Sequence, residues 1–125
     1  MSTSDNPTNP ASEVEDENAR WAAAERAFII AATRFHIGRL CMTPGAKAAF
    51  DALPPGSVSA DGLITRHLCG DWGDDMDEED RAANDRAIRN GERILSAYTL
   101  PEGTRIWIIT EADQSSTTLL LPDEY

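Results

Sequence analysis

The sequence predicts an α+β fold in which three or four helices pack on a small antiparallel β-meander of three or four strands. Two observations carry this prediction. Apolar residues recur at helical spacing up to about residue 90, and the last third changes to short β-rich runs separated by tight turns. Helices that are segregated from an antiparallel sheet define the α+β class. At 125 residues, the chain has room for one domain with a modest core.

The first third of the chain is predicted to lie outside this domain. Residues 1–12 are rich in Ser, Thr, Asn, Asp and Pro, and are expected to form a disordered tail. Residues 13–34 are expected to form an N-terminal helical extension. Its apolar stripe holds Trp21, Ala24, Phe28 and Ala32. The single α+β domain then spans residues 35–125.

The domain is predicted to begin with a strand and two short helices. Phe35–Met42 is a short apolar-rich run that can add a fourth strand to the sheet. Thr43 is an N-cap followed by proline at the first helical position, which predicts a helix over Pro44–Leu53. A second helix is expected over Ser59–Cys69, burying Leu63, Ile64 and Leu68, with Gly70 as its C-terminal stop.

A third helix of the domain is predicted over Glu78–Asn90, with Asp77 as its N-cap. Its thin apolar face holds Ala82, Ala83, Ala87 and Ile88. The polar residues beside them, including Asn84, are expected to face solvent and to form weak ion pairs at most.

The C-terminal third is predicted to form the meander. Three runs with strand character are separated by short turns: Arg93–Leu100, Thr104–Glu111 and Thr117–Leu121. Trp107, in the central strand, is expected to pack across the sheet. The terminal LLPDEY is consistent with a linear epitope and equally with a strand that ends at Pro122, leaving the tail in water.

Composition limits the classes of function. The chain carries 22 acidic and 11 basic residues, a net charge of −11, so it repels phosphate backbones and is not expected to bind nucleic acid directly. No apolar stretch is long enough to span a bilayer, and the N-terminus lacks the basic and apolar regions of a secretion signal. A cytoplasmic location without membrane contact is therefore expected.

The sharpest feature of the sequence is the acidic segment Gly70–Asp80, GDWGDDMDEED. Oxygen-rich clusters suit Mg²⁺ or Ca²⁺, but this spacing lacks the central glycine and the closing glutamate of an EF-hand loop. The acids can equally satisfy the start of a helix or form an electrostatic surface for a partner. Trp72, between two glycines, predicts a tight loop that folds the indole over the core, with partner contact as the alternative. The candidate partner-binding residues are Asp71, Trp72, Asp74, Asp75, Asp77 and Glu78.

Other chemistries find little support. His67 and Cys69, two positions apart on a helix, point to different faces. A zinc site built from His36, Cys41, His67 and Cys69 rests on composition alone. The sequence contains no phosphate-binding loop, nucleophile elbow or H-E-x-x-H motif. We therefore assign no catalytic residue, metal or cofactor, and expect a protein that is not an enzyme.

The stretch from His67 to Tyr125 carries a series of motifs. These are GDWG, E-D-x-x-x-N, S-x-Y, W-x-I-T-E-A-D and the terminal LLPDEY. In these motifs the chain, over about residues 38–125, resembles a family of short bacterial proteins found on plasmids, integrative elements and phages. Members are often labelled "plasmid-related protein" or "type I restriction endonuclease subunit M". The second label implies an adenine methyltransferase, whose N/D-P-P-Y/F motif this chain lacks: its only Pro-Pro pair lies in Leu53-Pro54-Pro55-Gly56.

Three functional hypotheses follow from the sequence. The first is a non-enzymatic acidic accessory protein of a mobile element that contacts a basic, nucleic-acid-handling protein, as an anti-defence or maintenance factor would. The second is a small metal-dependent enzyme that uses Asp71, Asp74 and His67. The third is a structural subunit of a restriction–modification complex.

Overall fold

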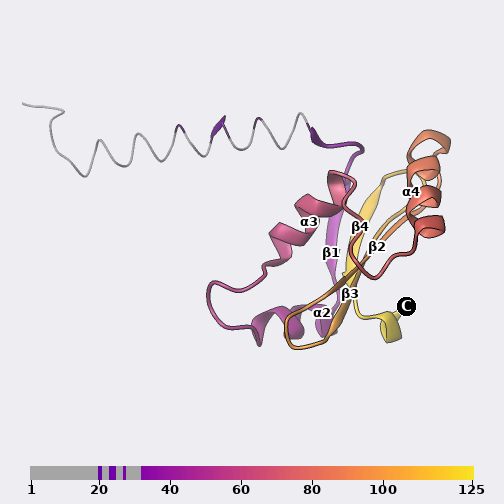
Figure 1. The fold of residues 1–125 in the computed structure, drawn as a ribbon. Helices are drawn as coiled ribbons and strands as arrows, with labels where there is room; N and C mark the ends of the chain where they lie inside the picture. Colours follow the sequence, from indigo (N-terminus) through magenta and orange to yellow (C-terminus); the bar gives the residue numbers. More distant parts are fainter. Residues whose placement is uncertain (1–19, 21–22, 25–26, 28–31) are drawn as a thin grey trace, which may run out of the picture. The chain divides into compact units, whose positions relative to one another are not determined.

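The computed structural model describes Arg20, Ala23, Ala24, Ala27 and residues 32–125 (Figure 1). The chain divides into two units, residues 1–32 and residues 33–125. The predicted tail over residues 1–12 lies outside the described residues, as does most of the predicted helix over residues 13–34. The described residues of that helix up to Ala32 are helical.

The second unit holds three α-helices and four strands, which confirms the α+β fold. In chain order the elements are β1 (Arg39–Met42), α2 (Pro44–Asp51), α3 (Ala60–Leu68), α4 (Glu78–Asn90), β2 (Ile94–Thr99), β3 (Arg105–Thr110), β4 (Ser116–Leu120) and the 3₁₀ turn η1 (Pro122–Glu124). Figure 1 shows α2 and α3 to one side of the sheet and α4 to the other. Within the part of the chain that the structure describes, no helix is long and apolar enough to cross a membrane.

The sheet has the strand order β1-β4-β3-β2. Strands β2, β3 and β4 form the predicted antiparallel meander. The fourth strand differs from the expected arrangement, because β1 pairs parallel to β4, with Arg39 beside Ser116 and Met42 beside Leu119. Parallel neighbours need a long crossover, and all three helices together with β2 and β3 lie between these two strands in the sequence. The sheet is therefore mixed.

The first strand is shorter than the predicted Phe35–Met42, because the chain bends at Gly38. This residue has φ +64°, and a Cβ there would lie 2.4 Å from the carbonyl oxygen of Gln114. Phe35 consequently leaves the sheet and packs in the core, where it is 6% exposed. The carbonyl of Ile37 accepts a hydrogen bond from the Thr117 hydroxyl at 2.7 Å, which fixes the bend to β4.

Two helices begin at the predicted caps Thr43 and Asp77, and the third begins after Ser59, which also acts as a cap. The side chains of Thr43, Ser59 and Asp77 accept hydrogen bonds from backbone N–H groups three residues later, at 3.2, 3.0 and 2.8 Å. Gly70 stops α3 with φ +86°. These local contacts explain why the helix starts could be predicted from sequence.

Two groups of buried side chains form the core. The larger group contains Ala46, Leu63, Ile64, Tyr98, Leu100, Ile106, Ile108 and Leu119. The smaller group, near α4, contains Phe35, Trp72, Met76, Ala87, Ile94 and Ala97. The predicted apolar face of α4 is only partly right, because Ala82 and Ala83 are exposed, whereas Asn84 and Ala87 are buried.

The C-terminal residues are exposed, Tyr125 at 66%, and are also tied to the domain by hydrogen bonds. The Glu124 carboxylate accepts hydrogen bonds from the Thr43 hydroxyl at 2.5 Å and from the backbone N–H groups of Leu121 and Gly45, at 2.8 and 3.2 Å. The Tyr125 ring meets Trp107 edge-on, with ring centroids 5.9 Å apart. One carboxylate thus ties the end of the chain to the start of α2.

Candidate functional site

The acidic segment forms a loop against β2, one of the two edge strands of the sheet. We call residues 70–77 the GDWG loop. The carbonyl of Trp72 accepts a hydrogen bond from the Ala97 N–H at 3.0 Å. Gly73 has φ +95°, and a Cβ at this position would lie 1.9 Å from the carbonyl oxygen of Ala97. Only glycine fits so close to the strand, so the second glycine of the motif has a steric reason.

Trp72 is the apolar anchor of the loop. Its side chain is 3% exposed, lies roughly parallel to the Phe35 ring at 6.2 Å and meets the His67 ring edge-on at 5.9 Å. The indole N–H donates to Asp85 at 3.4 Å, and Arg34 lies over the indole and pairs with the same carboxylate. The indole therefore folds into the core as predicted, and it supports the loop instead of offering a contact surface.

Polar side chains hold the loop backbone on both sides of Trp72. The Tyr98 hydroxyl donates to the carbonyl of Asp71 at 2.5 Å. Arg81 donates to the carbonyls of Met76 and Gly73, at 2.8 and 2.6 Å. Burial raises the pKa of Tyr98 to about 12, so the phenol keeps its proton at neutral pH. The loop is consequently fixed by bonds to its main chain.

Asp71 is the one loop acid in an ion pair. Arg66 donates to its two carboxylate oxygens at 2.7 and 3.2 Å, and the guanidinium also lies 4.7 Å from the centre of the Tyr98 ring. The hydrogen bond from Arg66 lowers the pKa of Asp71 and raises that of Arg66. The charge of Asp71 is thereby balanced within the protein.

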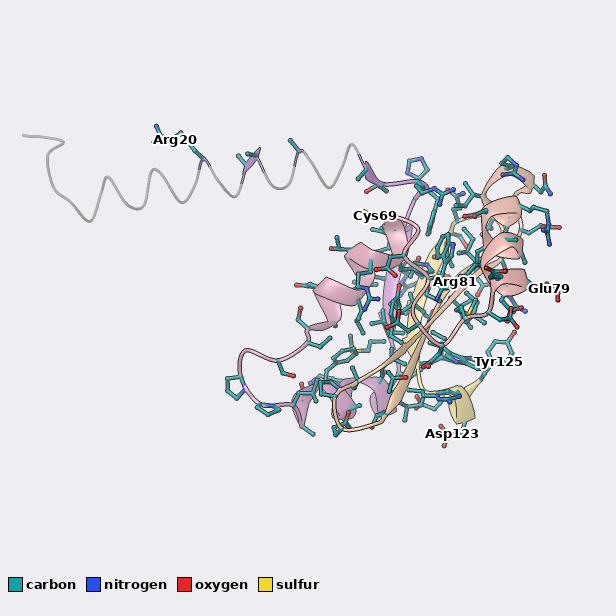
Figure 2. The ribbon with its side chains drawn as sticks, in the orientation of Figure 1. Arg20, Cys69, Glu79, Arg81, Asp123 and Tyr125 are labelled. Carbon is teal, nitrogen blue, oxygen red and sulfur yellow. The ribbon has the colours of Figure 1, made fainter. Side chains whose placement is uncertain are left out.

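The other six acids form what we call the acidic surface. Its members are Asp74, Asp75, Asp77, Glu78, Glu79 and Asp80, and all six are exposed. Asp75 accepts a hydrogen bond from the Thr99 hydroxyl, and Asp77 caps α4. Among the described residues none of the six is in an ion pair. Figure 2 shows Glu79 at the outer surface of the domain, pointing away from the first turn of α4.

Asn84 closes the same sheet edge from α4. It is 5% exposed; its side-chain amide donates to the carbonyl of Leu95 at 2.6 Å and accepts from the Leu95 N–H at 3.1 Å. The expectation that Asn84 faces solvent was wrong, because its amide pairs with β2 as a neighbouring strand would. The spacing of Asn84, Ala87 and Ile88 places the three residues on one helix face, and this signal could have found it. Asn84 and the GDWG loop together cover β2.

We expect Asn84→Ala to lower the free energy of unfolding by about 2 kcal/mol, because both backbone groups of Leu95 lose their partner. Urea denaturation followed by far-UV circular dichroism measures this loss. Asn90→Ala is the matched control, since Asn90 is exposed at the end of the same helix. Equal losses in the two variants would contradict a specific role for Asn84 at the sheet edge.

A buried chain of hydrogen bonds lies behind the loop and was not expected from sequence. His67 is fully buried, with Nδ1 2.5 Å from the Ser96 hydroxyl and Nε2 2.9 Å from the Thr110 hydroxyl. The Thr110 hydroxyl lies 2.7 Å from that of Thr117, which donates to the carbonyl of Ile37. The chain links α3 to β2, β3, β4 and the segment before β1.

The direction of these bonds fixes the tautomer of His67. The Thr117 hydroxyl donates its single proton to the carbonyl of Ile37, which can only accept a hydrogen bond. Thr117 therefore accepts from Thr110, so Thr110 is the donor in this pair. Thr110 can then only accept from His67, which places the proton on Nε2 and leaves Nδ1 to accept from Ser96. Burial lowers the pKa of His67 to about 3, so the ring is neutral at physiological pH.

This arrangement lies in the core of the domain. Ser96, His67 and Thr110 are each 0% exposed, so no substrate reaches the serine hydroxyl. Both ring nitrogens of His67 are occupied and Asp71 pairs with Arg66, so the set Asp71, Asp74 and His67 is not assembled as metal ligands. Across the residues that the structure describes, no three His, Cys, Asp or Glu side chains are grouped to hold a metal ion, the His36–Cys41–His67–Cys69 set included.

Comparison of the chain with protein-family models, with curated proteins and with solved structures found no match. The features from which a function follows are therefore those of this chain itself. They are a loop held rigidly through its backbone, six exposed carboxylates without an ion pair, and a polar core that substrates cannot reach.

Proposed function

We propose that the protein is a non-enzymatic accessory protein that binds a basic protein partner through the acidic surface. The observation that carries this proposal is the contrast within one segment. The backbone of the GDWG loop is fixed by Ala97, Tyr98 and Arg81, whereas the six carboxylates of the acidic surface are exposed and not in ion pairs. A surface that is ordered before binding loses less conformational entropy in the complex.

The charge of the chain indicates the chemistry of the partner. At −11 the protein attracts positively charged surfaces over a distance and speeds their association. Proteins that handle nucleic acid carry such surfaces, because they must neutralise phosphates. The motif resemblance adds a link to mobile elements and to restriction–modification or anti-defence systems, and a cytoplasmic location accords with such partners.

The other two hypotheses are less well supported. A metal-dependent enzyme needs Asp71, Asp74 and His67 together, and His67 lies in the core with both nitrogens engaged. A structural subunit of a restriction–modification complex would use the same acidic surface. A fixed stoichiometry in a complex that persists at high salt would distinguish the subunit from an accessory protein that binds reversibly.

A low-salt pull-down from the source cell, followed by measurement with the purified partner, tests the proposal. The test variant neutralises four surface acids: Asp74→Asn, Asp75→Asn, Glu78→Gln and Glu79→Gln. We expect its affinity for the partner to fall about tenfold or more, because several rim charges contribute together. Asp71 and Asp77 are left unchanged, since they hold Arg66 and cap α4.

The matched control neutralises four exposed acids elsewhere on the domain: Asp61, Glu92, Glu111 and Asp123. It carries the same net charge as the test variant, so a difference between the two isolates the acidic surface from the overall charge. Equal affinities for the two variants, or recovery of no basic partner by the wild-type chain, would contradict the proposal.

A further inference from the structure

The two edges of the sheet differ, because one is covered by other residues and the other is open. The edge of β2 is covered by Asn84 and the GDWG loop, whereas β1 forms the other edge and pairs only with β4 among the described strands. The N–H group of Arg39 donates to the carbonyl of Ser115, just before β4, at 2.9 Å, and that of Thr43 donates to the carbonyl of Leu119 in β4 at 3.0 Å. Because backbone groups alternate along a strand, those of Leu40 and Met42 point to the open edge.

The side chains of this edge are unusual for the surface of an acidic protein. Leu40 is 48% exposed and Met42 is 37% exposed. Both lie on one face of the sheet, since they pair in register with Thr117 and Leu119. No acidic residue occurs from residue 27 to residue 50, although the chain holds 22 acids. Arg39 is exposed and forms no ion pair within the described part of the chain.

We propose that β1 is a dimerisation edge on which a second copy of this chain adds its own β1 antiparallel, with the two-fold axis at Cys41. Leu40 of each copy then lies opposite Met42 of the other, and each such pair exchanges two backbone hydrogen bonds. The two sheets become one continuous sheet across the axis, and Leu40 and Met42 of both copies cover one another.

Charge complementarity favours a second copy as the occupant. In this register Arg39 lies opposite Thr43 of the second copy, whose hydroxyl donates to the Glu124 carboxylate at 2.5 Å. That hydrogen bond lowers the pKa of Glu124, which is therefore negatively charged at neutral pH. The unpaired guanidinium of each copy thus meets a carboxylate of the other, twice by symmetry.

Neighbouring registers fit less well. An axis at Met42 would place Leu40 opposite Pro44, which has no N–H to donate. An axis at Leu40 would place Arg39 opposite Cys41 and remove it from Glu124. The register centred on Cys41 is the one that keeps both the backbone bonds and the charge pairs.

Because Cys41 lies on the proposed two-fold axis, a disulfide between the two copies reports on the register. The two Cys41 residues form a pair without mutual backbone hydrogen bonds, in which Cα atoms lie about 4.5 Å apart. This separation falls within the range that a disulfide spans. Cys41 is a free thiol, as is Cys69 at the end of α3. With diamide as the oxidant, two Cys41 thiols lose their protons, their sulfurs join, and diamide takes up two electrons and two protons.

Diamide cross-linking of the full chain, read on a non-reducing gel, tests the register. We expect Cys69→Ser, which keeps Cys41, to form a disulfide-linked dimer on the gel, and Cys41→Ser, which keeps Cys69, to form none. A third variant moves the thiol two residues along the same face: Arg39→Cys with Cys41→Ser and Cys69→Ser. Its two thiols would lie about 14 Å apart and should not cross-link. Dimers that form through Cys69, or that form as readily through position 39, would overturn the proposed register.

Sedimentation equilibrium without oxidant tests the dimer itself. A four-residue edge makes a small interface, so we expect a reversible dimer that dissociates on dilution. Leu40→Lys with Met42→Lys should shift the chain to monomer, with an unchanged circular dichroism spectrum. Val58→Lys, at an exposed apolar side chain outside β1, should dimerise as the wild type does. A wild-type chain that stays monomeric at its highest soluble concentration, or an edge variant that still dimerises, would overturn the proposal.

Discussion

Lowering the pH from 6.5 to 4.5 is expected to reduce the free energy of unfolding by about 2 kcal/mol through His67 alone. The folded-state pKa of His67 is about 3, against 6.5 for the free side chain, because the ring is buried. The groups that surround the ring are the hydroxyls of Ser96 and Thr110 and the rings of Phe35 and Trp72, and none of them carries a charge.

The direction follows from where the proton binds. Below pH 6.5 the unfolded chain takes up a proton on His67 that the folded protein excludes, so acid favours unfolding. The stabilisation by the neutral ring is complete above pH 6.5 and is lost as the pH falls towards 3. In that window the loss is about 1.4 kcal/mol per pH unit.

Urea denaturation at pH 7 and pH 4.5 measures the effect, with His67→Gln as the matched variant. Glutamine is neutral at both pH values and keeps a donor and an acceptor. We expect it to lower stability at pH 7 by about 2 kcal/mol, through lost ring contacts and hydrogen bonds, and to show the smaller loss on acidification. Carboxylates such as Asp71, whose pKa is lowered by Arg66, titrate in both proteins and cancel in the difference. Equal pH dependence of the two proteins would contradict a buried, neutral His67.

Several residues of the sequence motifs make structural contacts. Asn84 of E-D-x-x-x-N closes the edge of β2, and the two named residues of S-x-Y hold His67 and the GDWG loop. Glu124 of the terminal motif fixes the start of α2. Each motif residue named here has a structural task, which separates the fold from the acidic surface proposed to bind a partner.

Elements that depend on neighbouring residues could be predicted from the sequence. The starts of α2, α3 and α4 follow from Thr43, Ser59 and Asp77, whose side chains bond to N–H groups within the next turn. The meander follows from β-rich runs separated by short turns, which leave antiparallel neighbours as the simplest pairing.

Contacts between distant residues could not be predicted in this way. The parallel pairing of β1 with β4 joins residues far apart in the sequence, and no local pattern specifies it. From its neighbours in sequence, His67 is simply one polar residue in a helix, whereas its two hydroxyl partners, Ser96 and Thr110, lie on two different strands. The same holds for Asn84, whose partner is a backbone and not a side chain.

Gly73→Ala is expected to cause the largest loss of stability, more than about 3 kcal/mol. A Cβ at this position would lie 1.9 Å from the Ala97 carbonyl oxygen, and the backbone has φ +95°, which disfavours any L side chain. The obstacle is strand backbone and not a flexible side chain. The loop must therefore leave the edge of β2, which breaks the bond from Ala97 to Trp72 and strains those from Arg81 and Tyr98.

Alanine substitutions at two other glycines distinguish the steric clash at Gly73 from backbone strain. Gly91 and Gly103 also have positive φ, +68° and +103°, but a Cβ at either position meets nothing within 4 Å. Substitution by alanine there should cost about 1 kcal/mol, the price of the backbone conformation alone. Urea denaturation of the three variants, with tryptophan fluorescence to report exposure of Trp72, makes the comparison.

The Gly73→Ala variant also distinguishes the effect of the anchored loop backbone on partner binding from the effect of its charge. Gly73→Ala leaves all six carboxylates of the acidic surface in place but releases the backbone that positions them. Where the variant remains folded, partner affinity should fall although the net charge is unchanged, because the surface must now be ordered on binding. Stability equal to that of the Gly91→Ala variant would show that the loop tolerates displacement from Ala97. Undiminished partner binding would show that charge alone, without a fixed loop, is sufficient.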